Sequence, residues 1–324
     1  MAVNEILYLS RRDIEDLALD IGEIIEAIDQ MFREKGESRV EMPPKPGIHT
    51  QPDAFIHAMP AYIPSLGAAG MKWISGYPGN QQRGLPYING LLILNDPETG
   101  IPLALMDATW ITAKRTGAAT AIAARYLARP DSTCAGIVAC GVQGRSNLEA
   151  LSRLFAFERV KAYDLKAEIA AEFAAEMGAQ LQLEIEPVKT AAEAVMGMDI
   201  VVTSGPILKN PSPPIPAGWL APGAFASPVD FDSYWRGEAF AEADKIATDD
   251  KDQLAYYRSA GYFRDTPEPY ADLGEIVCGK KHGRQAEEER IISINLGLAL
   301  EDMATAILVY RAALEKGVGQ RLPL

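Results

Sequence analysis

From Cys134 onward the sequence alternates short apolar stretches with stretches of helical periodicity. We expect strands at residues 134–140, 160–164, 182–185, 199–203, 224–229 and 245–247, and helices at residues 143–157, 166–177 and 190–196. Strands separated by helices favour a parallel sheet with right-handed crossovers. This alternation restricts the fold more than any other feature of the chain, and it predicts an α/β protein with a Rossmann-type domain.

The remainder of the chain predicts an α+β domain. Residues 11–34 show helical spacing of apolar side chains, and Ser10 precedes them as a candidate cap. Residues 42–47 contain three prolines and form a loop, because proline cannot donate a backbone hydrogen bond. We expect strands at residues 54–63, 67–75, 91–95 and 102–107, and helices at residues 111–128 and 298–316, the last ending at Gly317.

Composition narrows the class of protein. The formal net charge of −13 over 324 residues argues against nucleic acid or an anionic membrane as the main partner. The start of the chain carries early acids and arginines without an apolar signal core, and we find no uninterrupted apolar stretch long enough to span a bilayer. The three cysteines are widely spaced, so we expect free thiols in the cytoplasm and no metal site.

A glycine-rich turn lies between the first strand and the first helix of the alternating region. Its residues, Ala139-Cys140-Gly141-Val142-Gln143-Gly144, match the dinucleotide fingerprint incompletely, because alanine takes the first glycine position. Small residues allow the backbone to approach a pyrophosphate, which the helix N-terminus stabilises. Asp164 ends the second strand, where an acid accepts the adenosine ribose hydroxyls, so NADH is preferred to NADPH. A plain strand-to-helix turn with a surface aspartate is the alternative.

Two cations interrupt apolar segments. Lys72 lies inside the strand at residues 67–75, and Arg115 lies near the start of the helix at residues 111–128. A buried ammonium needs a partner or a function, and a guanidinium fork suits a carboxylate. From the residues alone, Lys72 could equally be an edge lysine that reaches solvent, and Arg115 could form a structural salt bridge.

Two further side chains are candidate site residues, and each could instead have a purely structural role. Asp232 follows the strand at residues 224–229, where loops face the cofactor crevice, but a lone aspartate there is also an ordinary turn residue. His57 lies on a strand, as a substrate contact or a structural histidine. No serine–histidine–aspartate order, zinc-protease motif or P-loop is present.

Several ordered motifs together resemble the ornithine cyclodeaminase/mu-crystallin family over nearly the whole chain. The chief ones are Gly70-Met-Lys72-Trp73, Leu94-Asn-Asp-Pro-Glu-Thr-Gly100, Thr112-Ala-Lys-Arg115-Thr116-Gly-Ala-Ala119, Gly141-Val-Gln143-Gly144 and Gly297-Leu-Ala-Leu-Glu301-Asp302. The resemblance implies a homodimer that binds NAD. Residues 115–298 would form the NAD-binding domain, and residues 1–114 with 299–324 the substrate-binding and dimerisation domain.

The resemblance also implies roles for individual residues. Lys72 and Arg115 would hold the substrate carboxylate, with Lys72 and Asp232 as catalytic residues. Lys45, where arginine is common in the family, His57 and Gly297 would complete the substrate site. The cofactor would contact Thr116, Gly141, Val142, Gln143, Gly144, Asp164, Thr203 and Ser204.

Members of this family differ in their chemistry. Some are dehydrogenases or imine reductases, some are cyclodeaminases that recycle NAD while converting ornithine to proline, and some are mu-crystallin-like ketimine reductases or ligand-binding proteins. The cationic set of Lys45, Lys72 and Arg115, with His57, suits a small acid better than a diamine tail. We therefore expect hydride transfer between NADH and the Cα of a small imino or amino acid, with iminosuccinate as a candidate.

Overall fold

The computed structural model describes residues 5–324 of the chain, which divide into two compact units. Unit 1 comprises residues up to Arg115 together with Leu298–Leu324, and unit 2 comprises Thr116–Gly297. The chain therefore passes between the units twice, at Arg115–Thr116 within a helix and at Gly297–Leu298. Among the described residues, no helix is long and apolar enough to cross a membrane.

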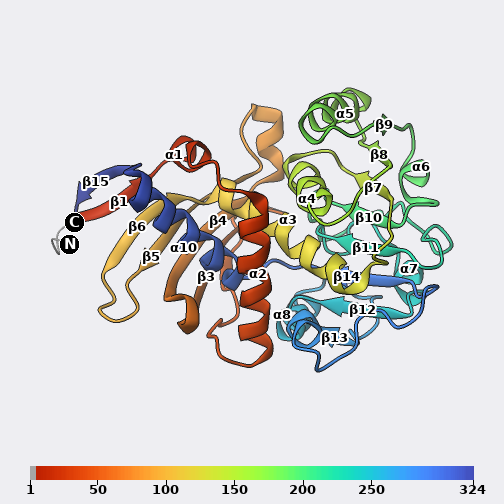
Figure 1. Cartoon of the computed structure of the whole chain (residues 1–324). Coiled ribbons are helices and arrows are strands. Elements are labelled where there is room, and N and C mark those ends of the chain that lie inside the picture. Colours follow the sequence, from red (N-terminus) through yellow and green to blue (C-terminus); the bar gives the residue numbers. More distant parts are fainter. Residues whose placement is uncertain (1–4) are drawn as a thin grey trace. The chain divides into compact units, whose positions relative to one another are not determined.

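Unit 1 is built on a seven-stranded sheet with the order β15-β1-β6-β5-β4-β3-β2 (Figure 1). Its strands are β1 (Glu5–Leu9), β2 (Gly47–Ile48), β3 (Phe55–Ile63), β4 (Ala68–Gly76), β5 (Ile88–Asn95), β6 (Pro102–Asp107) and β15 (Gln320–Pro323). Neighbours are antiparallel except β1 and β6, which run parallel. The sequence did not lead us to expect β1, β2 or β15.

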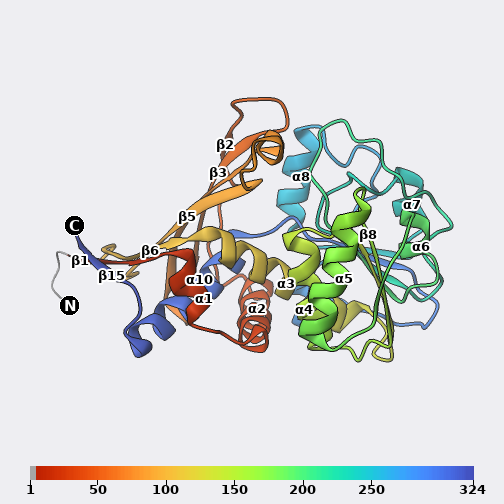
Figure 2. The same cartoon turned by 90° about the horizontal axis from the view of Figure 1, so that it is seen from above.

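Helices cover one face of this sheet. The second helix, α2 (Ile21–Gly36), packs on α10 (Ala299–Lys316), which lies across β3, β4 and β5 (Figure 2). Short 3-10 turns connect the strands at Pro64–Leu66 and Pro78–Arg83, and α3 (Ala108–Leu127) begins in this unit. The C-terminal helix ends as expected at Gly317, whose φ of 64° suits glycine.

The single helix expected at residues 11–34 is wrong. The structure has α1 (Arg11–Asp16), capped by Ser10 as expected, and then a break before α2. Ala18 adopts a φ of 48°, and the Asp20 side chain accepts a hydrogen bond from the backbone of Gly22. A second capping box therefore starts a new helix, although the apolar spacing continues through the break.

Unit 2 is a parallel eight-stranded sheet with the order β13-β12-β14-β11-β10-β7-β8-β9. Its strands are β7 (Cys134–Val138), β8 (Arg159–Tyr163), β9 (Ile185–Pro187), β10 (Ile200–Thr203), β11 (Phe225–Pro228), β12 (Lys245–Thr248), β13 (Ala271–Asp272) and β14 (Ile291–Ile294). The order β9-β8-β7-β10-β11 is that of a doubly wound dinucleotide-binding sheet, with its switch point between β7 and β10. The expected α/β class is therefore confirmed.

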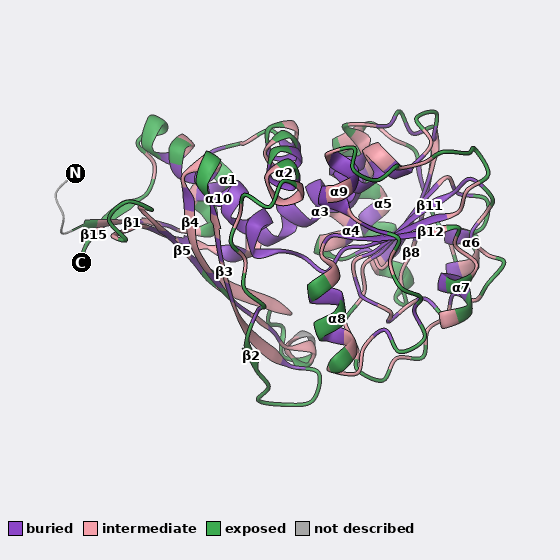
Figure 3. Cartoon of the chain, turned by 90° about the horizontal axis from the view of Figure 1, so that it is seen from below, coloured by how far each residue is buried: buried purple, intermediate pink, exposed green. Residues whose placement is uncertain are grey.

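The helices of unit 2 are α4 (Val142–Ser152), α5 (Ala167–Leu181), α6 (Ala191–Val195), α7 (Gly237–Ala241), α8 (Lys251–Ser259) and α9 (Leu273–Val277). Figure 3 shows the strands between them as almost wholly buried. Several expected elements of this unit have other bounds. The helix expected to reach residue 157 ends at Ser152, and the strand expected at residues 182–185 begins at Ile185, because α5 continues to Leu181 before Gln182 turns left-handed.

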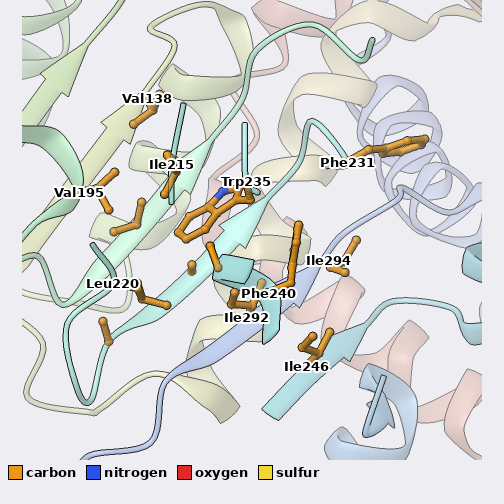
Figure 4. Close-up of a cluster of buried hydrophobic side chains, with 14 of the residues drawn as sticks. Val138, Val195, Ile215, Leu220, Phe231, Trp235, Phe240, Ile246, Ile292 and Ile294 are labelled. Carbon is orange, nitrogen blue, oxygen red and sulfur yellow. The ribbon is translucent and has the colours of Figure 1, made fainter. Parts of the chain in front are cut away.

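A hydrophobic cluster supports the β10–β11 side of this sheet. Trp235 is 1% exposed and lies among Ile215, Phe240 and neighbouring aliphatic side chains (Figure 4). Its indole nitrogen donates to the hydroxyl of Thr203 over 3.1 Å. Because Thr203 ends β10, this cluster fixes the strand end at which the site begins.

Candidate active site

Lys72 and Arg115, here called the cation pair, lie together in the interior of unit 1. Lys72 is 1% exposed and lies on β4 between β3 and β5, which excludes the alternative of an edge lysine that reaches solvent. Its ammonium donates to Asp302 over 2.7 Å and to the Thr112 hydroxyl over 3.2 Å. Arg115 Nη1 lies 2.7 Å from a Glu301 oxygen, and Arg115 Nε lies 3.1 Å from Asp302.

Burial shifts the proton equilibrium of Lys72. Desolvation lowers its pKa from 10.5 to about 7, although the carboxylate of Asp302 opposes this by favouring the ammonium. The positive charges of Arg115 and Lys45 lower the pKa further. A lysine with such a pKa can donate or accept a proton near neutrality, as a general acid or base must.

Lys45 and His57 interact electrostatically with Lys72 of the cation pair. Lys45, in the loop before β2, is 7% exposed, and His57 stacks on Phe55 with ring centroids 4.3 Å apart. Burial, followed by the charges of Lys45, His49 and Lys72, lowers the pKa of His57 to about 3. His57 is therefore neutral near pH 7, and it leaves the positive charge of this region to Lys45, Lys72 and Arg115.

The glycine turn of unit 2 has the shape that a pyrophosphate needs. A Cβ on Gly141 would meet no atom within 4 Å, whereas one on Gly144 would lie 2.6 Å from the carbonyl oxygen of Ala139. Gly141 is the N-cap residue of α4, and it offers no side chain to cap that helix. The turn is thus open at Gly141 and closely packed at Gly144, and its helix N-terminus can bind an anion.

Ala139 takes the place of a glycine in this turn at a conformational cost. Its φ is 73°, in the left-handed region that side chains disfavour. Ser204, which follows β10, donates to the Ala139 carbonyl over 2.8 Å, and the guanidinium of Arg145 donates to the carbonyl of Cys140. These contacts hold the strained turn in place across the β7–β10 switch point.

Asp164 follows β8 and is bound to the same turn. One of its oxygens accepts from the backbone N–H of Cys140 over 2.9 Å, and the other accepts from Lys166 over 3.1 Å. A carboxylate in this place can accept ribose hydroxyls with its remaining lone pairs. It also supports the turn, a role that the sequence did not suggest.

Two aspartates follow β11 and point to different partners. Asp230 is fully buried and accepts from Thr203 over 2.9 Å and from the Gly205 backbone over 2.9 Å, and burial raises its pKa to about 7. Phe231, between them, has a φ of 61°. Asp232 accepts from the Phe263 backbone over 2.7 Å, and burial raises its pKa also. The other oxygen of Asp232 is buried, and within residues 5–324 no hydrogen bond reaches it.

A buried polar network holds the segment that returns the chain to unit 1. The N–H of Gly297 donates to Asp249 over 2.7 Å, and its carbonyl accepts from Gln253 over 3.2 Å. The φ of Gly297 is 80°, which only glycine adopts without strain.

The candidate residues thus fall into two groups. Unit 1 gathers Lys45, His57, Lys72 and Arg115. Unit 2 carries the residues expected to contact the cofactor, together with Asp232 and Gly297. Within unit 2, the Thr203 hydroxyl is buried and bonded to Asp230, so this side chain stabilises the strand end instead of contacting the cofactor directly. No motif in the sequence assigned a role to Asp230, Glu301 or Asp302, because the two adjacent acids of α10 resemble ordinary acids in the first turn of a helix.

A doubly wound sheet with an open glycine turn defines a dinucleotide-binding protein. Residues 5–317 match the ornithine cyclodeaminase/mu-crystallin family, and the chain belongs to this family. The resemblance inferred from the sequence motifs is therefore confirmed.

Several relatives are dehydrogenases or reductases. Alanine dehydrogenase of Archaeoglobus fulgidus is 36% identical over 327 residues, covering 98% of each chain. The Delta(1)-pyrroline-2-carboxylate reductase of Thermococcus litoralis, solved with NADH and L-proline, has a TM-score of 0.90 and 36% identity and covers 97% of this chain and 99% of that chain. An archaeal alanine dehydrogenase dimer with bound NAD has a TM-score of 0.87 and 35% identity, covering 98% and 99%.

Proposed function

We propose that this protein is an NAD-dependent oxidoreductase that exchanges hydride with the Cα of a small imino or amino acid. The relatives named above act in this class, and two of their structures hold NAD or NADH. When bound, the reduced nicotinamide supplies a hydride to an electrophilic carbon. The chain supplies a carboxylate site, a group that can move a proton, and an anion-binding turn.

The observation that carries this proposal is the buried cation pair. Lys72 and Arg115 face the two carboxylates of Glu301 and Asp302, and Lys45 adds a further positive charge. Three cations thus stand against two carboxylates. The excess of positive charge suits an incoming carboxylate, which Arg115 can orient while Lys72 exchanges a proton with the substrate nitrogen.

The same charges disfavour a cyclodeaminase. A diamine substrate carries an ammonium on its side chain, and this group needs a carboxylate that is not already engaged. Beside the cation pair in unit 1, Glu301 and Asp302 are bonded to Lys72 and Arg115, and His57 is neutral. Lys45 would instead attract a second carboxylate, so a dicarboxylic imino acid such as iminosuccinate is a candidate substrate.

Turnover tests this proposal directly. Keto acids with ammonia, including pyruvate and oxaloacetate, and pyrroline-2-carboxylate are supplied with NADH or NADPH. Ornithine is supplied with catalytic NAD. We expect stoichiometric loss of the reduced-nicotinamide absorbance with at least one imino acid. Ammonia release from ornithine without net consumption of NADH would instead establish a cyclodeaminase, and inactivity throughout would favour a ligand-binding protein.

We propose Asp164 as the residue that selects NADH over NADPH. Asp164→Asn keeps an oxygen that can accept from Cys140 but removes the charge that repels a 2′-phosphate. We expect it to weaken NADH binding about ten-fold and to leave NADPH binding equal or stronger. Asp131→Asn, an exposed change in the same unit, is the matched control. Equal losses for both cofactors would remove Asp164 from the ribose site.

We also propose a homodimer formed through the helix-free face of the unit 1 sheet. Trp73 and Leu91 are each 45% exposed there, and with Asp107 they border a shallow pocket of about 320 Å³. An exposed apolar patch of this kind is typical of an interface. The archaeal alanine dehydrogenase was solved as a dimer. The expected cytoplasmic location remains a proposal that rests on the three widely spaced cysteines.

A further inference from the structure

Two adjacent acids, Glu301 and Asp302, lie in the first turn of α10 and are both 0% exposed. Carboxylates are almost never fully buried unless they are paired. Glu301 interacts with the backbone of the N-cap residue Leu298, but acids at a helix start can do this while exposed to solvent, so capping alone does not explain why both acids point into the protein. Their burial therefore requires another reason.

The contacts of this acid pair are selective. A single oxygen of Asp302, Oδ1, lies 2.7 Å from the Lys72 ammonium and 3.1 Å from Arg115 Nε. Of the two cations, Glu301 binds only Arg115, through Oε2 at 2.7 Å, and it also interacts with the backbone of Leu298 at the start of α10. The second oxygen of each acid is buried, and no residue between 5 and 324 forms a hydrogen bond with it. Each acid is thus aimed at the cation pair with one oxygen.

We propose that Asp302 is a positioning residue for both Lys72 and Arg115, and that Glu301 is a positioning residue for Arg115 alone. The proposal deepens the proposed function, because it assigns the acids to the carboxylate site of that reaction. A single turn of α10 would then fix Lys72 on β4 and Arg115 on α3 relative to each other.

The two acids should differ in their effect on Lys72. The groups that face Lys72 are Asp302 on α10, Arg115 and Thr112 on α3, Lys45 in the loop before β2, and His57 on β3, whereas Glu301 contacts Arg115. Asp302 raises the pKa of Lys72, whereas Arg115 and Lys45 lower it. Loss of the Asp302 charge should therefore lower the pKa of Lys72 further, while loss of the Glu301 charge should change it little.

The first experiment measures the pKa of Lys72 by NMR and does not require catalytic turnover. The full chain is labelled with ¹³C at lysine Cε, the Lys72 signal is assigned with Lys72→Gln, and its shift is followed against pH. We expect a midpoint near 7 in the natural protein, a fall of about one unit or more in Asp302→Asn, and little change in Glu301→Gln. Glu315→Gln, an exposed change on the same helix, is the control. An unchanged midpoint in Asp302→Asn, or an equal fall in Glu301→Gln, would overturn the proposal.

The second experiment separates the roles by kinetics with the substrate found for the proposed reaction. Glu301→Gln should raise KM about ten-fold with kcat nearly unchanged, because only Arg115 is loosened. Asp302→Asn should lower kcat/KM about a hundred-fold and move the limb of the pH profile that belongs to Lys72 towards lower pH. A merely structural role would lower the yield of folded protein and leave this limb of the pH profile of the folded fraction unmoved.

Asp302→Glu keeps the proposal testable if Asp302→Asn does not fold. It retains the charge, so the Lys72 midpoint should stay near that of the natural protein, while the displaced carboxylate lowers kcat. A midpoint that falls in Asp302→Glu would contradict the assignment. If no imino acid is turned over, the proposed function fails, and the titration of Lys72 still decides the role of Asp302.

Discussion

At the scale of single residues, the structure shows why partners were harder to predict than functional side chains. Lys72 and Arg115 were recognisable because a charge inside an apolar segment is conspicuous. Asp302 was not, because it lies 230 residues away in sequence from Lys72 and resembles an ordinary acid at a helix start. Only tertiary pairing distinguishes it from a solvated side chain.

Asp230 should make stability depend on pH. Its pKa is about 7 in the folded protein against 3.8 for a free carboxyl, so its contribution to stability is full below pH 3.8 and is lost as the pH rises through 7. Asp230→Asn should remove this slope. We expect the natural protein to lose up to about 2–4 kcal/mol relative to Asp230→Asn between pH 4 and pH 7. Urea unfolding at several pH values measures the difference, and parallel profiles would show that Asp230 ionises normally.

At the scale of elements, periodicity predicted the regular parts of the chain and failed at their ends. The strands β3, β4 and β6 and the helix α10 lie within one or two residues of the expected bounds. The break between α1 and α2 was missed because it depends on capping by Asp20, which apolar spacing does not register. The edge strand β15 depends on pairing with β1, and β1 depends on pairing with β15 and β6, which no local pattern reveals.

The glycine turn permits a matched pair of substitutions. Gly144→Ala places a Cβ 2.6 Å from the Ala139 carbonyl, so it should cost about 1–3 kcal/mol in stability and weaken NADH binding. The Cβ that Gly141→Ala adds meets no atom within 4 Å, so stability should fall by less than about 1 kcal/mol. The same Cβ would lie where the pyrophosphate approaches the turn, so NADH binding should weaken about ten-fold or more. Thermal unfolding and NADH titration measure both effects. Tight NADH binding by Gly141→Ala would place the pyrophosphate elsewhere.

At the scale of the whole molecule, the sequence indicated the fold class and the family, because both depend on many motifs at once. It could not indicate which surfaces are left uncovered. The apolar side chains of β4 and β5 alternate between the two faces of the sheet, and sequence alone does not show that helices cover only one of them.

This uncovered face leads to a prediction about assembly. Leu91→Lys places a charge on the face proposed for the dimer and should shift the protein from dimer towards monomer in sedimentation equilibrium, with the unfolding temperature of the remaining dimer reduced. Leu314→Lys, on α10 and 40% exposed, is the matched control and should leave the mass unchanged. If both variants keep the mass of the natural protein, the dimer forms through another surface or does not form.

The alternation of β4 has a consequence for how this chain can diverge. Lys72 points to the helix-covered side, and its neighbour Trp73 lies on the open side. Deleting one residue ahead of them would exchange the two, sending an indole among the buried acids and an ammonium onto an apolar surface. Length changes in this strand would thus damage the proposed chemistry and the proposed assembly in one step. A change of substrate specificity is easier to reach by changes in the loop that carries Lys45, because insertions there leave the register of the sheet intact.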